Sequence, residues 1–243
     1  MHKLSIPEVL KQIKDTDKVL DIGGWAHPFE RADAVVDALP YETRGKVGQL
    51  GMPERFTKET WVQWDICNHK PWPFKDKQFD FVICSHVLED IRDPLWVCSE
   101  LIRVSKRGYI ETPTREAELL YGVQSYEFTG FQHHRWFVEN VDGQLFFTQK
   151  TPLAHIEQRG FYLIHTDSIM RFFWDESFNF EEKFAGVDTF STGNKMISWS
   201  KDFQRTMPKK IQAVNEVIKW IPSIYMKKNV QKMFRSIWKL PRI

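Results

Sequence analysis

Residues 71–94 read PWPFKDKQFDFVICSHVLEDIRDP, and this stretch decides the fold. Its centre, Phe79–Cys84, is an apolar run of strand length without clean polar alternation, which is typical of a strand buried on both faces. The next segment, Pro94–Val104, has apolar residues at helical spacing, as a crossover helix between parallel strands requires. The stretch therefore predicts one strand-helix unit of a parallel sheet.

Further apolar runs of strand length lie on both sides of this unit: Lys18–Ile22, Ala34–Val36, Trp61–Trp64 and Gly108–Ile110. A short helix is predicted over residues 5–14, with Pro7 in its first turn and Ser5 as its N-cap. The second half differs, because Trp136–Gln149 has two aromatic-rich runs around the turn dipeptide Asp142-Gly143, which favours a hairpin. We therefore expect an α/β fold with antiparallel strands in the C-terminal half.

The composition fits one globular domain. The chain has 243 residues, 42% of them hydrophobic, and a net charge of +2, so it can bury one core and nothing indicates disorder. The three cysteines show no CxxC spacing, which argues against a disulfide framework and a zinc site. The N-terminus lacks the apolar core of a signal peptide, and no window reaches the ~20 apolar residues of a membrane span. We expect a cytoplasmic protein with its domain at residues 1–204.

The remaining residues, 205–243, form a basic tail. They contain ten Lys or Arg and a single acid, Glu216, which gives the tail a charge of +9 on an otherwise acidic chain. Residues 223–240, SIYMKKNVQKMFRSIWKL, interleave cations with bulky apolar side chains, a pattern suited to an anionic lipid surface. Ordinary packing and peripheral membrane contact both stay open for this tail, and no nucleic-acid partner is expected.

Acidic residues stand at strand ends in chain order. Asp21 lies in VLDIGG, Asp37 ends AVVD, Asp65 follows WVQW and Asp80 opens FDFVIC. In an open parallel sheet, ligands bind beyond the carboxyl ends of the strands, where the strand order reverses. An acid that ends the second strand can accept hydrogen bonds from ribose hydroxyls, and one that ends the third can accept from an adenine amino group. Asp37 and Asp65 therefore indicate a nucleoside site.

These segments, together with GYIETP at 108–113, resemble the successive motifs of class I S-adenosylmethionine-dependent methyltransferases over roughly residues 18–113. Residues 71–94 resemble the signature of the family's small-molecule, type 11-like branch, with Asp90 where His is commoner. The resemblance implies a Rossmann-like, mostly parallel sheet flanked by helices. It also implies S-adenosylmethionine as cofactor, a cofactor half at about 18–113 and an acceptor-site half at about 114–204.

The resemblance assigns cofactor contacts to the first loop, to the ends of the second and third strands, and to the end of the fourth. The expected residues are Asp21, Gly23, Gly24, Trp25, Asp37, Leu39, Asp65, Ile66, Ser85 and His86. Several of them have a structural alternative. Asp37 and Asp65 can be helix N-caps or solvated loop acids. Asp21 can serve only to hold the backbone of the glycine loop, and Trp25 can either stack beside the cofactor or plug the loop into the core.

The first loop departs from the family pattern. The family usually has D-x-G-x-G-x-G, whereas Trp25 and His27 stand where the second and third glycines would lie. Only 15 residues separate Asp21 from Asp37, so the helix normally found between these strands must be shortened, and Pro28 restricts it further. This departure motivates a competing hypothesis, a non-catalytic S-adenosylmethionine-binding protein on the same fold.

Methyl transfer is an in-line displacement on an activated sulfonium, so alignment of the nucleophile does most of the work and no strong catalytic motif is expected. For an oxygen nucleophile a general base adds about 10²–10⁴-fold. The candidate bases are His86 and the pair His133-His134, because His titrates nearest pH 7. Alternatively, His86 makes only a hydrogen bond in the cofactor pocket, and the pair His133-His134 only packs its loop on the sheet. One metal held by both adjacent histidines is not expected, because neighbours in an extended chain point apart.

The expected function is O-methylation of a small molecule or a glycan. The chain has no G-x-G-x-x-G fingerprint for a dinucleotide, no phosphate-binding P-loop, and no [DNS]-PP-[YFW] tetrapeptide of the enzymes that methylate a flipped base. The sequence specifies neither the acceptor nor the oligomeric state.

Overall fold

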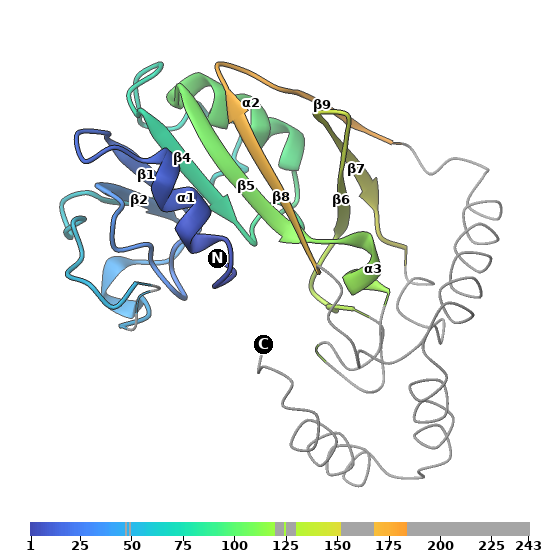
Figure 1. The fold of residues 1–243 in the computed structure, drawn as a ribbon, viewed down its shortest axis with the longest axis horizontal. Helices are drawn as coiled ribbons and strands as arrows, with labels where there is room; N and C mark the ends of the chain where they lie inside the picture. The colour runs from blue at the N-terminus through green and yellow to red at the C-terminus, as the bar shows by residue number, and fades with distance from the viewer. Residues whose placement is uncertain (47, 49, 120–123, 125–129, 152–167, 184–243) are drawn as a thin grey trace, which may run out of the picture. The chain divides into compact units, whose positions relative to one another are not determined.

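The computed structural model describes residues 1–46, 48, 50–119, 124, 130–151 and 168–183 (Figure 1). Its elements in chain order are α1 (Ile6–Gln12), β1 (Val19–Ile22), β2 (Ala34–Asp37), the 3-10 helix η1 (Tyr41–Thr43), β3 (Trp61–Gln63), β4 (Phe81–Ser85), α2 (Pro94–Val104), β5 (Arg107–Pro113), α3 (Arg115–Glu118), β6 (Trp136–Val141), β7 (Gln144–Gln149), β8 (Ile169–Asp175) and β9 (Asn179–Glu182). None of these helices is long and apolar enough to cross a membrane.

The chain divides into two compact units. The first comprises Met1–Arg115, His133–Lys150 and Asp167–Phe184, and it contains the whole predicted cofactor half. The second comprises Glu116–Gln132, Thr151–Thr166 and Ala185–Ile243. Residues 184–204 of the predicted acceptor-site half and the entire basic tail lie outside the described residues, so the predictions made for them stay predictions.

The first unit is built on a six-stranded sheet of order β3-β2-β1-β4-β5-β8. The strands β1 to β5 run parallel, and β8 pairs antiparallel with β5, where Tyr109 lies opposite Phe173. The chain moves outward from β1 to β3 and then returns to the other side of β1 as β4, so the strand order reverses between β1 and β4. The predicted parallel α/β sheet with antiparallel strands in the second half is confirmed.

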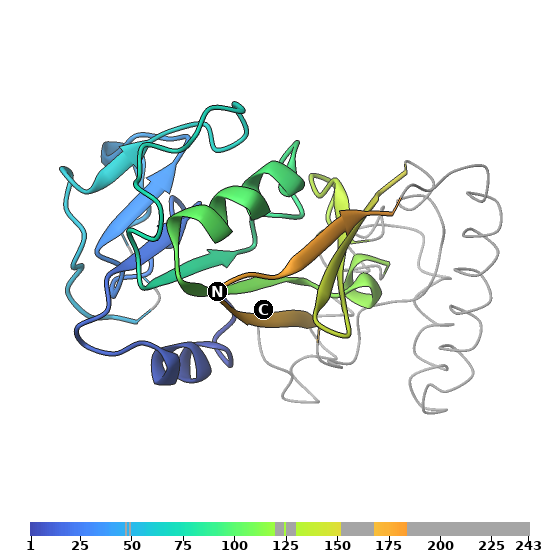
Figure 2. The ribbon, with the colours of Figure 1, turned by 90° about the horizontal axis from the view of Figure 1, so that it is seen from above.

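The helices α1 and α2 cover opposite faces of this sheet (Figure 2). Successive side chains of β1 therefore enter different clusters: Leu20 packs with Leu101 of α2, and Val19 packs with Val9 of α1. All four side chains are fully buried, and each contributes about 1.5–3 kcal/mol by leaving water. Burial on both faces explains why the strand sequences show no polar alternation.

The crossover helix α2 has the predicted bounds. Asp93 caps it, because its carboxylate accepts a hydrogen bond from the Trp96 N–H at 2.9 Å, and Pro94 occupies the first turn, where its missing N–H costs nothing. The predicted hairpin is also confirmed. Asp142 and Gly143 both have positive φ, as the tight turn between β6 and β7 requires, and β9 extends this second sheet in the order β6-β7-β9.

Two local predictions need correction. Ser5 occupies the predicted N-cap position of α1, but it has helical dihedrals and its side chain makes no capping hydrogen bond; its hydroxyl instead accepts a hydrogen bond from Arg171 Nε of β8 at 2.9 Å. The shortened helix expected between β1 and β2 is absent from residues 23–33, which the structure describes as turns. The span is too short for a helix to cross back, and Pro28 lies in its middle.

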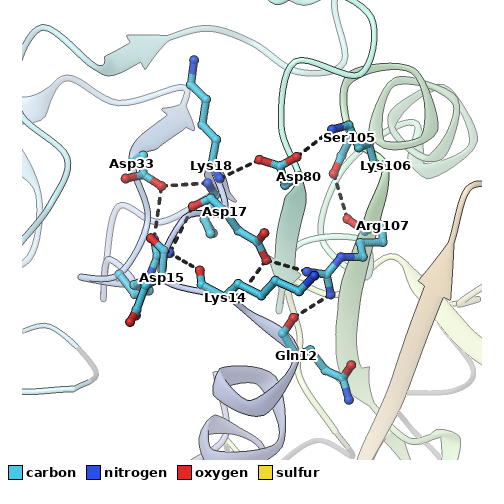
Figure 3. Close-up of polar contacts among 12 residues, drawn as sticks. Gln12, Lys14, Asp15, Asp17, Lys18, Asp33, Asp80, Ser105, Lys106 and Arg107 are labelled. Carbon is cyan, nitrogen blue, oxygen red and sulfur yellow. Dashed lines mark hydrogen bonds and ion pairs between the residues drawn. The ribbon is translucent and has the colours of Figure 1, made fainter.

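The amino ends of β1, β4 and β5 are joined by a polar network (Figure 3). Asp80 pairs with Lys106 Nζ at 2.7 Å and accepts a hydrogen bond from the Lys18 N–H, while Arg107 pairs with Asp17 at 2.5 Å. This network lies at the start of the strands, so Asp80 is separated from the other acids of the predicted series. The network stabilises the start of the sheet and lies away from the carboxyl ends of the strands.

Candidate functional site

The predicted cofactor residues share one edge of the sheet. The loop after β1 carries Gly23 and Gly24, β2 ends at Asp37, Asp65 follows β3, and His86 follows β4. Because these four strands are parallel, their carboxyl ends meet at the same edge, and the strand order reverses there between β1 and β4. The structure thus brings the predicted set together at the position where open α/β sheets bind ligands.

The glycine loop is held tightly against its surroundings. Gly23 has φ +69° and donates its N–H to the Val36 carbonyl at 2.9 Å, and a Cβ at this position would lie 2.5 Å from Val87 Cγ2. The Asp21 carboxylate accepts a hydrogen bond from the Phe29 N–H at 2.9 Å, and burial raises the pKa of Asp21 to about 7. These contacts support the interpretation in which Asp21 fixes the loop backbone.

Asp37 joins the glycine loop to the segment after β2. Its two carboxylate oxygens accept hydrogen bonds from the Trp25 N–H at 3.1 Å and the Leu39 N–H at 2.8 Å, and burial raises its pKa. A carboxylate has about four acceptor sites, so Asp37 keeps acceptor capacity for a ligand. The Trp25 indole is 36% exposed and donates to Thr43 Oγ1 at 3.0 Å, so Trp25 does not plug the core.

Asp65 forms an ion pair that the sequence did not indicate. Arg92 donates to one carboxylate oxygen of Asp65, which lowers its pKa, and the Cys67 N–H donates to the other oxygen at 3.0 Å. Both charged side chains are about half exposed, and pairs of this kind contribute about 0–1 kcal/mol. A weak pair leaves the carboxylate able to exchange one donor for another. Ile66, next in the chain, is partly buried against the core.

The end of β4 carries a cluster of one imidazole and two carboxylates. His86 has φ +57°, which aims its ring so that Nδ1 lies 3.2 Å from Glu89 Oε1 and Nε2 lies 3.1 Å from Glu111 Oε1. Glu111 is fully buried and also accepts hydrogen bonds from Ser85 Oγ at 3.1 Å and Tyr109 Oη at 2.6 Å. Ser85, one of the predicted cofactor residues, is thus part of this cluster.

The cluster holds separated charges. Burial alone would favour neutral forms, but the hydrogen bonds that His86 makes with Glu111 and Glu89 raise the pKa of His86 to about 9. Burial likewise opposes ionisation of Glu111, yet its hydrogen bond with His86 and its other donors bring its pKa below the ordinary range. At neutral pH His86 is therefore an imidazolium that donates from both nitrogens. It can accept a substrate proton only after losing its own.

The two other predicted bases, His133 and His134, lie beside Asp90. Asp90 belongs to the same β4–α2 loop as His86. His133 Nε2 and His134 Nε2 are 3.7 Å and 3.5 Å from Asp90 Oδ1. The two rings contact each other, with centroids 4.5 Å apart at 78°. The expectation that these neighbours point apart is wrong, because residues 133 and 134 precede β6 and do not continue its extended backbone.

Residues 47–110 match the family model described as a methyltransferase domain. The match spans β3, β4, α2 and most of β5, so it includes Asp65 and His86, and it begins after Asp37. The match agrees with the family resemblance read from the sequence.

Solved structures of similar proteins include a SAM-dependent methyltransferase from Thermotoga maritima, 19% identical with a TM-score of 0.32, which aligns over 47% of this chain and 53% of that one. A protein from Pyrococcus horikoshii is 18% identical with a TM-score of 0.33 and aligns over 55% of this chain and 66% of that one. The chain thus spans about half to two thirds of the length of these structures. No curated protein matches it.

Sequence reasoning overlooked two charged residues near the carboxyl ends of the strands, Glu111 and Arg92. Glu111 stands in ETP, two residues before the end of β5, so the series of acids near strand ends could have been extended to it. Arg92 gave no comparable signal. Its role depends on the β4–α2 loop folding back toward Asp65, which no local pattern predicts.

The pKa of His86 predicts a pH-dependent stability for the first compact unit. Because the folded-state pKa of about 9 lies above the ordinary value of 6.5, protonated His86 stabilises the fold fully below pH 6.5, and this contribution is lost as the pH rises through about 9. The side chain is 37% exposed, so solvent screening limits the contribution to about 1–2 kcal/mol. Urea unfolding at pH 6.0 and pH 9.5 measures it.

The matched variants are His86→Gln and His69→Gln, since His69 is an exposed histidine that also pairs with an acid, Asp93. We expect the stability difference between the two pH values to shrink in His86→Gln and to persist in His69→Gln. An unchanged difference in His86→Gln would show that His86 does not carry the charge assigned to it.

Proposed function

We propose that this protein is an S-adenosylmethionine-dependent methyltransferase that methylates an oxygen of a small molecule or a glycan. The observation that carries the proposal is the placement of Asp37 and Asp65 at the carboxyl ends of adjacent parallel strands, beside the Gly23 turn at the point where the strand order reverses. The family match over residues 47–110 supports the reaction class.

The residues at this edge fit the cofactor. Any side chain at Gly23 or Gly24 would collide with Val87 or Asp21, so the loop keeps bare backbone at the place where a ligand approaches. In the proposed complex, Asp37 accepts hydrogen bonds from the ribose hydroxyls and Asp65 accepts one from the adenine amino group. The bound cofactor supplies a methyl group on a positively charged sulfur, ready for in-line displacement.

The proposed catalytic role of His86 rests on its position directly after β4, and it leads to a prediction about pH. A base must be neutral before it accepts a proton, and the pKa of His86 is raised to about 9. If His86 removes the proton of the acceptor hydroxyl, turnover rises with pH up to this range. His133 and His134 are the alternative residues of the acceptor site.

The remaining parts of the proposal rest on the sequence. The acceptor class, a cytoplasmic location and peripheral membrane contact through residues 205–243 are proposed from the motifs and from the charge of the tail. The competing function is a non-catalytic S-adenosylmethionine-binding protein, motivated by Trp25 and His27 in the glycine loop. Transfer of radiolabelled methyl from S-adenosylmethionine to small molecules of a cell extract separates the two, because a binding protein gives affinity without product.

Replacing Asp37 is expected to weaken cofactor binding. Asp37→Ala should raise the Kd for S-adenosylmethionine at least tenfold, because the ribose hydroxyls would be left without their acceptor at a buried position. Isothermal titration calorimetry with S-adenosylmethionine and its demethylated product measures this change. Asp65→Ala should have the smaller effect, since water can replace an acceptor for the adenine amino group.

The matched control is Asp80→Asn, which alters a carboxylate that also accepts a backbone N–H but lies at the opposite edge of the sheet. Its Kd should equal that of the unaltered protein. Asp37→Asn serves as a second variant, because it keeps one acceptor oxygen for the glycine loop. Wild-type affinity in Asp37→Ala would refute the ribose assignment.

A further inference from the structure

We propose that Asp90, His133 and His134 form a binding site for one divalent transition-metal cation, with Zn²⁺ as the best match. One ligand atom from each of these residues can be chosen so that all three atoms lie within 4.8 Å of one another. The site lies within the first compact unit, in the β4–α2 loop and the segment before β6. It is separate from the residues assigned to the cofactor.

The spacing of the ligand atoms suits a metal better than a hydrogen bond. The two Nε2 atoms lie 3.5 Å and 3.7 Å from Asp90 Oδ1, beyond the usual hydrogen-bond range. Around a tetrahedral Zn²⁺ with bonds of about 2.0–2.1 Å, neighbouring ligand atoms are about 3.3 Å apart. These two distances need to shorten by only a few tenths of an ångström, and the third, between the histidine nitrogens, is within 4.8 Å before a metal binds. By contrast, His69 Nε2 and Asp93 Oδ2 lie 2.9 Å apart, as in an ordinary hydrogen bond.

The backbone fixes the two parts of the site against each other. The N–H groups of Arg135 and Trp136 both donate to the Glu89 carbonyl, at 2.6 Å and 3.1 Å, and the Trp136 indole donates to the Ile91 carbonyl at 2.9 Å. These bonds bracket Asp90 on one segment and adjoin the histidines on the other. The two segments that carry the ligands are thus held together before a metal binds, which lowers the cost of ordering them.

The donor set determines the class of ion. Two imidazole nitrogens and one carboxylate suit Zn²⁺, Co²⁺ or Fe²⁺, whereas Mg²⁺ and Ca²⁺ prefer sets made of oxygen. His134 is 5% exposed and anchors the site, while His133 is 55% exposed, so the ion would be reached from the His133 side. Three protein ligands leave a fourth position for water, the arrangement of catalytic zinc sites.

Zinc titration of the full-length, tag-free protein tests the proposal. After removal of metals with a chelator, isothermal titration calorimetry with ZnCl₂ should show one equivalent bound with a Kd of about 10 μM or tighter, which is about 7 kcal/mol of binding free energy. Titration with CoCl₂ should give a visible spectrum of four-coordinate Co²⁺ without thiolate charge transfer, because Cys67, Cys84 and Cys98 are buried. Neither measurement depends on S-adenosylmethionine, so failure here is distinct from failure of the proposed function.

Variants locate the ion. His133→Ala should raise the Kd for Zn²⁺ at least tenfold. Because His133 is exposed, this variant should keep its fold, which circular dichroism checks. Asp90→Asn should weaken binding similarly, whereas His69→Ala, which removes a histidine paired with another acid, should leave the Kd unchanged. Binding of less than half an equivalent, unchanged affinity in His133→Ala, or loss of binding in His69→Ala would each overturn the proposal.

Discussion

Glu111→Ala is expected to lower the free energy of unfolding at pH 7 by about 3–5 kcal/mol, because removal of one partner of a buried ion pair leaves the other charge uncompensated. Glu111 is fully buried at the end of β5, and its carboxylate accepts hydrogen bonds from Ser85, His86 and Tyr109. All of these donors lose their acceptor together. Urea unfolding followed by circular dichroism measures the change.

Two variants separate the charge of Glu111 from its shape. Glu111→Gln keeps the volume and one acceptor oxygen, so its loss should be smaller than that of Glu111→Ala, and NMR titration should place the pKa of His86 below its wild-type value of about 9. Glu181→Ala removes an exposed carboxylate from β9 and should change stability by less than about 0.5 kcal/mol. A change of that small size in Glu111→Ala would mean that the cluster does not stabilise the fold.

Gly23→Ala is expected to cost about 2–4 kcal/mol of stability and to weaken S-adenosylmethionine binding at least tenfold. Two penalties act at this residue: the left-handed backbone at φ +69° strains any L side chain, and the new Cβ would lie 2.5 Å from Val87 Cγ2. Relief of the clash moves the loop after β1 away from the loop after β4. Urea unfolding and calorimetry with the cofactor measure the two effects.

The chain contains a matched control for the backbone term. Gly51 has nearly the same φ, +67°, and a Cβ there meets no atom within 4 Å, so Gly51→Ala should lose only about 1–2 kcal/mol. Val87→Ala should remove the collision, so Gly23→Ala and Val87→Ala combined should cost less than the sum of the two single changes. Two results together would contradict the close packing of the two loops: an equal loss of stability in Gly23→Ala and Gly51→Ala, and a Gly23→Ala/Val87→Ala double variant whose loss equals the sum of its two single changes.

The sequence by itself determined the parallel sheet, the helix α2 and the hairpin between β6 and β7. Each follows from local rules: strands buried on both faces are apolar throughout, a crossover helix shows a 3.6-residue period, and Asp142-Gly143 adopts positive φ readily. The edge at which the cofactor residues meet was equally predictable, since the carboxyl ends of parallel strands are brought together by topology alone.

Only the tertiary structure decided which side chains meet within that edge. Three groupings depend on the fold: the pairing of Arg92 with Asp65, the enclosure of His86 between Glu89 and Glu111, and the convergence of both histidines on Asp90. In each, the β4–α2 loop meets another part of the chain: the segment after β3, strand β5 or the segment before β6. Such contacts depend on how loops fold back, and loop paths carry no periodic signal in the sequence. The charge of His86 depends in turn on burial, on the nearby Glu89 and on Glu111 of β5, so its protonation state could be assigned only after the chain was folded.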